Sequence, residues 1–400
     1  MSLFFEGLLF ALMALAAFPV LLLVMQVAGA LRCARHPASL PSAPAPMPSG
    51  SIAVLMPAHN EADGIKRTIQ SVLPQLRATD HLLVVADNCS DETAQRARDA
   101  GASVIERQDP QRRGKGHALD FGMQHLAALQ PEVVIILDAD CLASPGAIPL
   151  LASQAAWRQT PIQAHYRMQT PADANLMNKV SAFAWRFKTL VRPLGYLAFG
   201  LPSQLMGSGM AFPMQLLSRF DLGGSHLVED LKLGLDMTCA GAAPRFEPGA
   251  EVISSLPPST QGSRRQRTRW EHGHLGMLAT APTLFALALR KRSGTLLAAV
   301  ADLCVPPLAL LVLLLAALSV LALGTFLLLG WMLPLRFITA IDLLFGLSML
   351  VAWWRFGRDV LSAGELAAIP FYVLWKVPVY IGFVFRRERA WVRTERGPTP

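Results

Sequence analysis

A long apolar segment near the start of this 400-residue chain limits its possible folds more than any other feature. It runs from Gly7 to Leu31 and holds no charged side chain. A helix of about 20 apolar residues crosses the hydrocarbon core of a bilayer, so this segment is long enough to span one. A cleaved signal peptide is the alternative, but no basic region precedes the segment and its apolar run is too long. We therefore expect a transmembrane helix within residues 1–36.

The charges on either side of this segment predict its orientation. Glu6 is the only charged side chain before it, whereas Arg32 and Arg35 follow it. Positive charge is retained on the cytoplasmic side of a membrane. We therefore expect the N-terminus outside, the middle of the chain in the cytoplasm, and a location in an inner membrane of the bacterial type.

Residues 281–400 are predominantly apolar again and predict a C-terminal membrane region with two to three spans and a cytoplasmic basic tail. Cys304–Leu323 and Phe337–Trp354 are expected to cross the bilayer, whereas Leu366–Phe385 is interrupted by two prolines and a lysine. Basic clusters precede the first segment, follow the second and follow the third, and all of them favour the cytoplasm. The third segment is therefore expected to be re-entrant or interfacial, with an additional crossing as the alternative. The chain as a whole should have three to four spans.

The composition agrees with a membrane protein and narrows its partners. Hydrophobic residues make up 52% of the chain and charged residues only 16%, which is low for a soluble globular protein. The net charge of +8 suits an anionic membrane surface and a phosphorylated substrate, and no other feature indicates nucleic acid. The five cysteines are scattered and form no CxxC pair, which argues against a disulfide framework or a zinc site and favours a reduced cytoplasm.

The middle of the chain has the pattern of an α/β domain. Residues 37–50 are rich in proline, serine and alanine and are expected to form a linker. From residue 51 to about 280 we expect a cytoplasmic domain with a mixed, mainly parallel sheet, whose ligands bind at the carboxyl ends of the strands. The expected strands are 52–56, 82–86, 104–105 and 133–137, and the expected helices between them are 61–76, 91–100 and 115–129.

Asp138 and Asp140 follow the apolar run that ends the fourth expected strand. Two carboxylates on alternate residues supply hard oxygen ligands, which suit Mg²⁺ or Mn²⁺ when phosphate oxygens complete the coordination shell. Two solvated loop aspartates are the alternative, because this spacing is common by chance. The position after a buried strand favours the metal site.

Other residues at the strand ends could bind a nucleotide. Asp87 follows the second expected strand, and its carboxylate could accept the imide N–H of uracil; a helix cap is the alternative. Lys115 lies between two glycines and could contact a diphosphate, unless this is an ordinary loop before a helix. The remaining candidates lie where the first strand turns into the first helix, whose backbone amides could face a phosphate; they are Pro57, Ala58, His59, Asn60 and Glu61.

Two later motifs carry further candidates. Glu229 and Asp230 are expected at a helix start, where acidic residues commonly interact with the helix dipole, but Asp230 could also act as a general base. The run at 264–270 is basic and precedes the membrane region, where contact with lipid headgroups is the alternative. Within it, Trp270 could stack on a sugar face while Arg269 holds a diphosphate.

Taken in order, these motifs resemble those of the membrane-bound family 2 glycosyltransferases, which include cellulose, chitin and hyaluronan synthases and ceramide glucosyltransferase. The resemblance covers about residues 51–270 together with the flanking apolar segments. It rests on PAHNE (57–61), VVADNCSD (84–91), LDAD (137–140), VED (228–230) and QRTRW (266–270).

The resemblance implies a GT-A-like nucleotide-sugar-binding domain flanked by transmembrane helices, a UDP-sugar donor and an inverting single displacement. By matching position, Asp87 would hold uracil, and Asp138 with Asp140 would hold the diphosphate and the Mg²⁺ or Mn²⁺. Asp230, with Glu229 beside it, would provide the base. Gln266, Arg269 and Trp270 would shape the acceptor and diphosphate end.

The expected reaction is transfer of one sugar to a hydroxyl of a membrane-associated lipid or polysaccharide, in glycolipid or exopolysaccharide biosynthesis, where assembly partners are possible. A processive β-polysaccharide synthase is the second hypothesis, although Val228 and the short membrane portion depart from the pattern of processive members. A catalytically inactive nucleotide-sugar-binding subunit and a nucleotidyltransferase are further alternatives.

Residues 175–199 mix aromatic and basic side chains, and could lie in the membrane interface or form the wall of the acceptor site.

Overall fold

The fold is described from a computed structural model of the chain, which covers residues 2–35, 45–170, 174–224, 228–255 and 260–385. For residues 2–4, 255, 260–267, 384 and 385 only the backbone is described. Most of the expected linker and the basic tail after residue 385 lie outside these ranges, and so does the side chain of Gln266.

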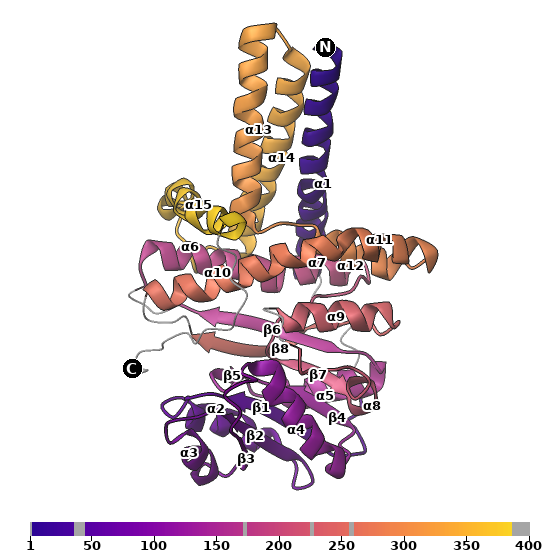
Figure 1. Ribbon diagram of the computed structural model, residues 1–400, viewed down its shortest axis with the longest axis vertical. Coiled ribbons are helices and arrows are strands. Elements are labelled where there is room, and N and C mark those ends of the chain that lie inside the picture. Colours follow the sequence, from indigo (N-terminus) through magenta and orange to yellow (C-terminus); the bar gives the residue numbers. More distant parts are fainter. Residues whose placement is uncertain (1, 36–44, 171–173, 225–227, 256–259, 386–400) are drawn as a thin grey trace.

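Three long apolar helices project from the rest of the molecule as a bundle (Figure 1). They are α1 (Ser2–Arg35), α13 (Leu308–Leu329) and α14 (Met332–Phe356), and each is long and apolar enough to cross a membrane. The span expected from Cys304 in fact begins at Leu308, because Pro306 and Pro307 precede it and interrupt the helical hydrogen-bond ladder.

A fourth apolar segment, Gly364–Phe383, also meets the length and composition of a span. It consists of the short 3₁₀ helix η5 (Gly364–Ala368) and most of α15 (Ile369–Phe385). Figure 1 shows α15 at the base of the bundle rather than alongside its three helices. An interfacial segment thus remains the prediction for residues 366–385, with an additional crossing as the alternative.

An eight-stranded sheet forms the opposite end of the molecule (Figure 1). In spatial order, its first four strands are parallel to one another. The strands β7 and β5 are antiparallel to their neighbours, and β6 and β8 are parallel to each other. The expected mixed, mainly parallel sheet is therefore present. In spatial order the strands are β3 (Ser103–Arg107), β2 (His81–Asp87), β1 (Ile52–Ala58), β4 (Val133–Ile136), β7 (Met210–Pro213), β6 (Ile162–Gln169), β8 (Arg245–Ser255) and β5 (Cys141–Ala143).

Side chains alternate between the two faces of each strand, so the sheet has a hydrophobic core on each side. Ile52 and Val54 of β1 belong to one core, and Ala53 and Leu55 to the other. The first core includes residues of α2 (Ile65–Val72) and α5 (Ala147–Arg158). The second includes residues of α4 (Lys115–Leu129), α8 (Met214–Leu217) and α9 (Glu229–Cys239).

The expected helices of this domain are present, with two shorter than predicted. The helix over 115–129 has the expected bounds, whereas 91–100 narrows to α3 (Thr93–Asp99). The helix expected from Glu61 begins only at Ile65 and ends before the 3₁₀ turn η2 (Leu73–Gln75). Residues 62–64 form a turn instead, in which the backbone N–H of Gly64 donates a hydrogen bond of 3.1 Å to the carbonyl oxygen of Glu61, and Asn60 just before it has a left-handed φ of 55°. The expected helix N-terminus is therefore displaced from the PAHNE motif.

A layer of helices separates the sheet from the bundle (Figure 1). One continuous helical segment of this layer contains α6 (Leu176–Arg186), the single π-helical turn η3 (Phe187–Val191) and α7 (Arg192–Ala198). The other helices of the layer are α10 (Thr260–Met277), α11 (Ala281–Arg290) and α12 (Gly294–Leu303), and the 3₁₀ turn η4 (Leu278–Thr280) joins the first two.

The bundle is attached to this layer by close packing and by a buried polar cluster. A Cβ atom added to Gly195 of α7 would lie 2.1 Å from the carbonyl oxygen of Gln26, so only glycine permits this approach of α1. The Gln26 side chain donates a hydrogen bond of 2.6 Å to Asp302 of α12. Asp302 also forms a buried ion pair of 2.7 Å with Arg192. These contacts join the first membrane helix to the helical layer.

Candidate active site

The acidic motif after β4 forms a compact group of potential metal ligands. Ligand atoms of Asp138, Asp140 and Cys141 all lie within 4.8 Å of one another. Burial, together with the two aspartates, raises the pKa of the Cys141 thiol well above its ordinary value, and its Sγ lies 3.5 Å from Asp140 Oδ1. A raised pKa disfavours the thiolate form that binds metals, so the two carboxylates are the main donors. This hard oxygen set fits Mg²⁺ or Mn²⁺.

Lys115, at the first position of α4, connects this group to the rest of the site. Its ammonium forms an ion pair with Asp138 and donates a hydrogen bond of 2.6 Å to the carbonyl oxygen of Gly207. Burial alone lowers the pKa of Lys115, but Asp138, Glu229 and Asp230 together raise it above its ordinary value. The lysine expected to contact a diphosphate thus lies among three carboxylates of two separate motifs.

Asp230 and Glu229 form the first turn of α9, as expected from the sequence. A Cβ atom added to Gly207 would lie 3.4 Å from Asp230 Oδ2 and 3.8 Å from Lys115 Nζ, so these two groups flank the same glycine. Burial raises the pKa of Glu229; Asp230 acts in the same direction, while Lys115 and Arg269 oppose it. The VED motif and Arg269 of the QRTRW motif therefore lie close enough to interact electrostatically.

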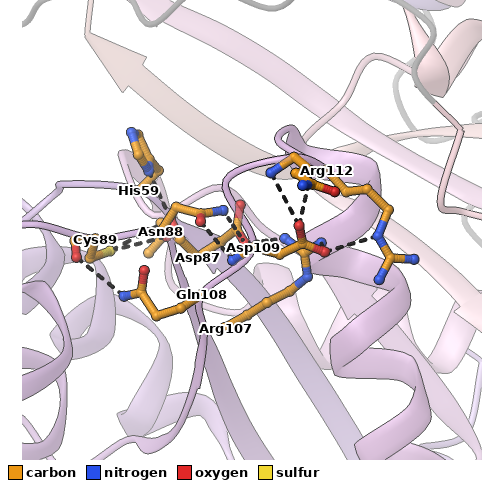
Figure 2. A network of polar contacts seen from close by, with 10 residues as sticks. His59, Asp87, Asn88, Cys89, Arg107, Gln108, Asp109 and Arg112 are labelled. Atoms are coloured by element: carbon orange, nitrogen blue, oxygen red, sulfur yellow. Dashed lines mark hydrogen bonds and ion pairs between the residues drawn. The ribbon is translucent and has the colours of Figure 1, made fainter.

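Asp87 lies at the end of β2, buried within a polar network that Figure 2 shows. Its Oδ1 atom is 2.6 Å from Arg107 Nη1 and accepts a hydrogen bond of 3.0 Å from Asn88 Nδ2. Arg107 also pairs with Asp109 at 3.1 Å. His59 contacts the carbonyl oxygen of Asp87 through Nδ1, at 2.7 Å. Asp87 Oδ1 is thus held in place by neighbouring side chains.

Arg107 was not among the residues predicted from the sequence. No motif contains it, but its position in the sheet could have indicated it: Asp87 and Arg107 are register partners in the parallel pair formed by β2 and β3. An aspartate and an arginine at the same level of neighbouring strands can form an ion pair across the strand ends.

The remaining residues of the PAHNE motif occupy two kinds of position. Pro57 and Ala58 are the last residues of β1, and Ala58 contributes to the core. Glu61 lies in the turn that follows, where its backbone N–H donates a hydrogen bond of 2.7 Å to Thr93 Oγ1. These residues adjoin the Asp87 network through His59 but belong to a strand end and a turn, not to a helix N-terminus.

Trp270 lies on α10 and stacks on Trp185 of α6, with ring centroids 4.7 Å apart and an interplanar angle of 27°. Tyr166 of β6 meets the Trp185 ring edge-on at 5.4 Å, and its hydroxyl lies 3.7 Å from Cys141 Sγ. A series of contacts thus leads from the acidic group to Trp270. His272 lies two residues further along α10, and its Nε2 atom is 2.9 Å from the carbonyl oxygen of Val379 in α15.

Comparisons with known proteins identify the family of this chain. The sequence profile described as "Glycosyltransferase like family 2" matches residues 48–273, more than half of the chain. The chain therefore belongs to glycosyltransferase family 2.

The comparisons also include individual relatives. The chain is 25% identical over 254 residues to the probable glycosyltransferase YdaM of Bacillus subtilis, a match that covers 60% of this chain and 59% of that protein. It is 36% identical over 98 residues to glucosyl-3-phosphoglycerate synthase of Mycolicibacterium paratuberculosis. The second match covers 23% of this chain and only 29% of the relative.

A solved structure supports the fold assignment. The mannosyltransferase PcManGT of Pyrobaculum calidifontis, solved with GDP-mannose and Mn²⁺, superimposes with a TM-score of 0.56 at 16% sequence identity. The likeness covers 94% of this chain and 100% of that one. The domain is therefore GT-A-like, as the sequence motifs implied.

Proposed function

We propose that this protein transfers one sugar from a UDP-sugar to a hydroxyl group of a membrane-associated acceptor, with inversion at the anomeric carbon. The observation that carries the proposal is the convergence of three motifs: Asp138 pairs with Lys115, Lys115 and Asp230 both lie near Gly207, and Arg269 interacts with Glu229. A site that breaks a sugar–diphosphate bond needs cations for the leaving group and a base for the incoming hydroxyl, and this cluster contains both.

The proposed donor site extends from Asp87 to the acidic group after β4. The Asp87 carboxylate accepts the imide N–H of uracil, and Arg107 and Asn88 hold that carboxylate in place through its Oδ1 atom. Lys115 then binds the diphosphate in place of its present contact with Asp138, and His59 and Glu61 line the approach from β1. When bound, Mg²⁺ or Mn²⁺ held by Asp138 and Asp140 supplies positive charge that stabilises the departing diphosphate.

Asp230 is the proposed general base. The acceptor hydroxyl transfers its proton to the Asp230 carboxylate as its oxygen bonds to the anomeric carbon. The bond from that carbon to the diphosphate breaks at the same time, and its electron pair leaves with UDP. Arg269 and Lys115 are the proposed protein cations for this charge, because both interact electrostatically with Glu229, which adjoins Asp230.

The proposed acceptor is a lipid or a membrane-bound saccharide. Three observations support this: four segments long and apolar enough to span a bilayer, a helical layer between bundle and sheet, and Trp270 within that layer. We place the sheet and the site on the cytoplasmic side, with cytoplasmic nucleotide sugars as the donors.

The proposal is tested by UDP release from the full chain in nanodiscs, with a panel of UDP-sugars and extracted membrane lipids. We expect EDTA to abolish release, and Mg²⁺ or Mn²⁺ to restore it, because the oxygen set after β4 binds such ions. Full turnover in metal-free buffer would contradict the metal assignment, and release from GDP-sugars alone would contradict the uracil contact. Product sizing distinguishes single transfer from the alternative of a processive synthase.

A further inference from the structure

A single π-helical turn interrupts the helix that lies between the sheet and the bundle. In η3 the backbone N–H of Arg192 donates to the carbonyl oxygen of Phe187, five residues earlier. Pro193 follows directly and has no N–H, so the regular ladder cannot continue there. Isolated π turns inside helices are frequent at functional sites, and this one carries the side chain of Lys188.

Lys188 lies beside the stacked tryptophan pair. Its Nζ atom is 5.7 Å from the centroid of the Trp185 ring, within the range of a cation–π contact. Trp185 in turn stacks on Trp270, the aromatic residue of the proposed acceptor site. An ammonium group and two indole rings therefore meet on the side of the site that faces the helical layer.

The charges around Lys188 single out Asp230 as its partner. Burial lowers the pKa of Lys188; among the nearby carboxylates that oppose this effect, Asp230 acts most strongly, ahead of Asp302 and Glu271. Asp302 is already paired with Arg192, and Glu271 forms an ion pair of 2.5 Å with Lys376. In the described part of the chain, no direct ion pair joins Lys188 to Asp230. The two groups therefore interact electrostatically without forming a direct ion pair.

We propose that Lys188 and Trp185 belong to the acceptor site, and that the reactive hydroxyl of the acceptor lies between the Lys188 ammonium and the Asp230 carboxylate. The hydroxyl oxygen accepts a hydrogen bond from Lys188 and donates its proton to Asp230, while the acceptor head group packs against Trp185 and Trp270. This inference rests on the proposed function, and it adds two residues that the sequence motifs do not contain.

The same arrangement specifies the chemical class of the acceptor. Lys188 and Asp230 are opposite in charge, so the Asp230 carboxylate would repel an anionic head group placed between them, and the nearby cation Arg192 is already paired with Asp302. Indole rings stack well on the C–H face of a polyol or sugar. We therefore assign to this site a lipid with an uncharged, hydroxyl-bearing head group.

The test uses cross-linking, which does not depend on turnover. The full chain is placed in phosphatidylcholine nanodiscs with a diacylglycerol that carries a diazirine at the top of one acyl chain, or with the corresponding phosphatidic acid. Cross-linked peptides are located by mass spectrometry in the parent chain, Lys188→Met and Lys188→Arg. Lys179→Met is the matched control, because Lys179 lies on α6 but pairs with Glu365 at 2.7 Å. UDP affinity and thermal stability are measured for each protein.

We expect the diacylglycerol to cross-link to the peptides that hold residues 185–188 and 268–271. Lys188→Met should reduce this yield about tenfold, the usual effect of losing one hydrogen bond to a charged group. Lys188→Arg and Lys179→Met should resemble the parent, and UDP affinity should be unchanged in all variants. A purely structural lysine would instead lower stability and leave cross-linking to the folded protein unaffected.

Equal yields in Lys188→Met and the parent would overturn the inference, and preference for phosphatidic acid would overturn the uncharged class. If Lys188→Met does not fold, the cross-linking pattern of the parent chain is the test. A parent chain without cross-links at residues 185–188 would contradict the proposal. A parent that cross-links as expected but transfers no sugar would contradict the proposed function and leave the lipid site intact.

Discussion

Three aspartates of the proposed site carry the same carboxylate group but have different neighbours, so we expect different roles for them. Asp138 and Asp140 belong to the acidic group after β4, whereas Asp230 lies across Gly207 from Lys115 and interacts with Lys188. Carboxylates so placed should respond differently when their charge is removed.

The first prediction concerns Asp230→Asn, which keeps the shape of the side chain but removes its proton affinity. If Asp230 is the base, kcat should fall by roughly 10²–10⁴-fold, the usual contribution of a positioned proton transfer. UDP affinity should be nearly unchanged. Asp140→Asn should weaken metal-dependent UDP binding as well as turnover. UDP binding and turnover are to be measured separately in nanodiscs; near-normal turnover of Asp230→Asn would leave Glu229 as the nearest candidate base.

The second prediction concerns His165 of β6. Burial, together with Arg186 and Arg167, lowers its pKa from 6.5 to about 4, although the nearby Glu251 acts in the opposite direction. Between these values the unfolded chain binds a proton that the folded chain does not, so the stability present above pH 6.5 is lost as the pH falls toward 4. The loss should be about 3 kcal/mol, and His165→Gln should remove that part of the pH dependence. Thermal unfolding from pH 7 to pH 4 measures it; identical profiles would contradict the assignment.

At the scale of elements, the contact between α1 and α7 determines how the first membrane helix meets the site layer. Gly29 and Gly195 let the two backbones approach, and the Gln26–Asp302–Arg192 cluster lies at the same crossing. Close helix crossings at small residues are common in membrane proteins. α7 also continues the π turn that carries Lys188, so this crossing and the proposed acceptor site share one helical segment.

The third prediction concerns Gly195→Ala. The added methyl would lie within 2.6 Å of three atoms of Gln26, so the helices must separate. Overpacking of this kind typically destabilises by about 1–3 kcal/mol, which exceeds the helix propensity that alanine gains. The control is Gly7→Ala in α1, where a Cβ atom would meet nothing within 4 Å. Thermal unfolding in detergent should show a lower Tm for the first variant only; an unchanged Tm would mean that the crossing adapts without cost.

For the whole molecule, the bundle and the sheet lie at opposite ends, with the helical layer between them (Figure 1). The start of α1 and the connection between α13 and α14 lie together at the end of the bundle that is farthest from the sheet. A membrane around the bundle would therefore separate these points from the sheet.

The fourth prediction tests this orientation in intact cells with a membrane-impermeant thiol reagent. A cysteine at Met332, an exposed residue at the start of α14, should be labelled from outside. A cysteine at Ser49, exposed next to β1, should be protected, because the arginines that follow the first span favour the cytoplasm. The parent chain with its five native cysteines gives the background. Labelling at Ser49 would reverse the orientation of the site.

Local chemistry was sufficient to predict much of this molecule from the sequence. Apolar segments such as Gly7–Leu31 must be helical in a bilayer, because only a helix satisfies their backbone polar groups within the segment. The alternation of strand and helix patterns predicted the sheet. Because the carboxyl ends of parallel strands meet at one edge, Asp87 and Asp138 were both expected at that edge. The bounds of α4 were predicted as well, since a glycine before Lys115 and a polar residue after Leu129 limit the helix.

Contacts between distant segments could be read only from the tertiary structure. The Arg107–Asp87 pair depends on strand register, and the Trp185–Trp270 stack on two helices separated in sequence by more than 70 residues. The relation of Lys188 to Asp230 arises from a π turn, which no local pattern announced. The sequence alone determined which chemical groups exist and on which elements they lie, because those depend on neighbouring residues. The packing of helices on the sheet decided which of these groups meet, because that depends on the complementarity of whole surfaces.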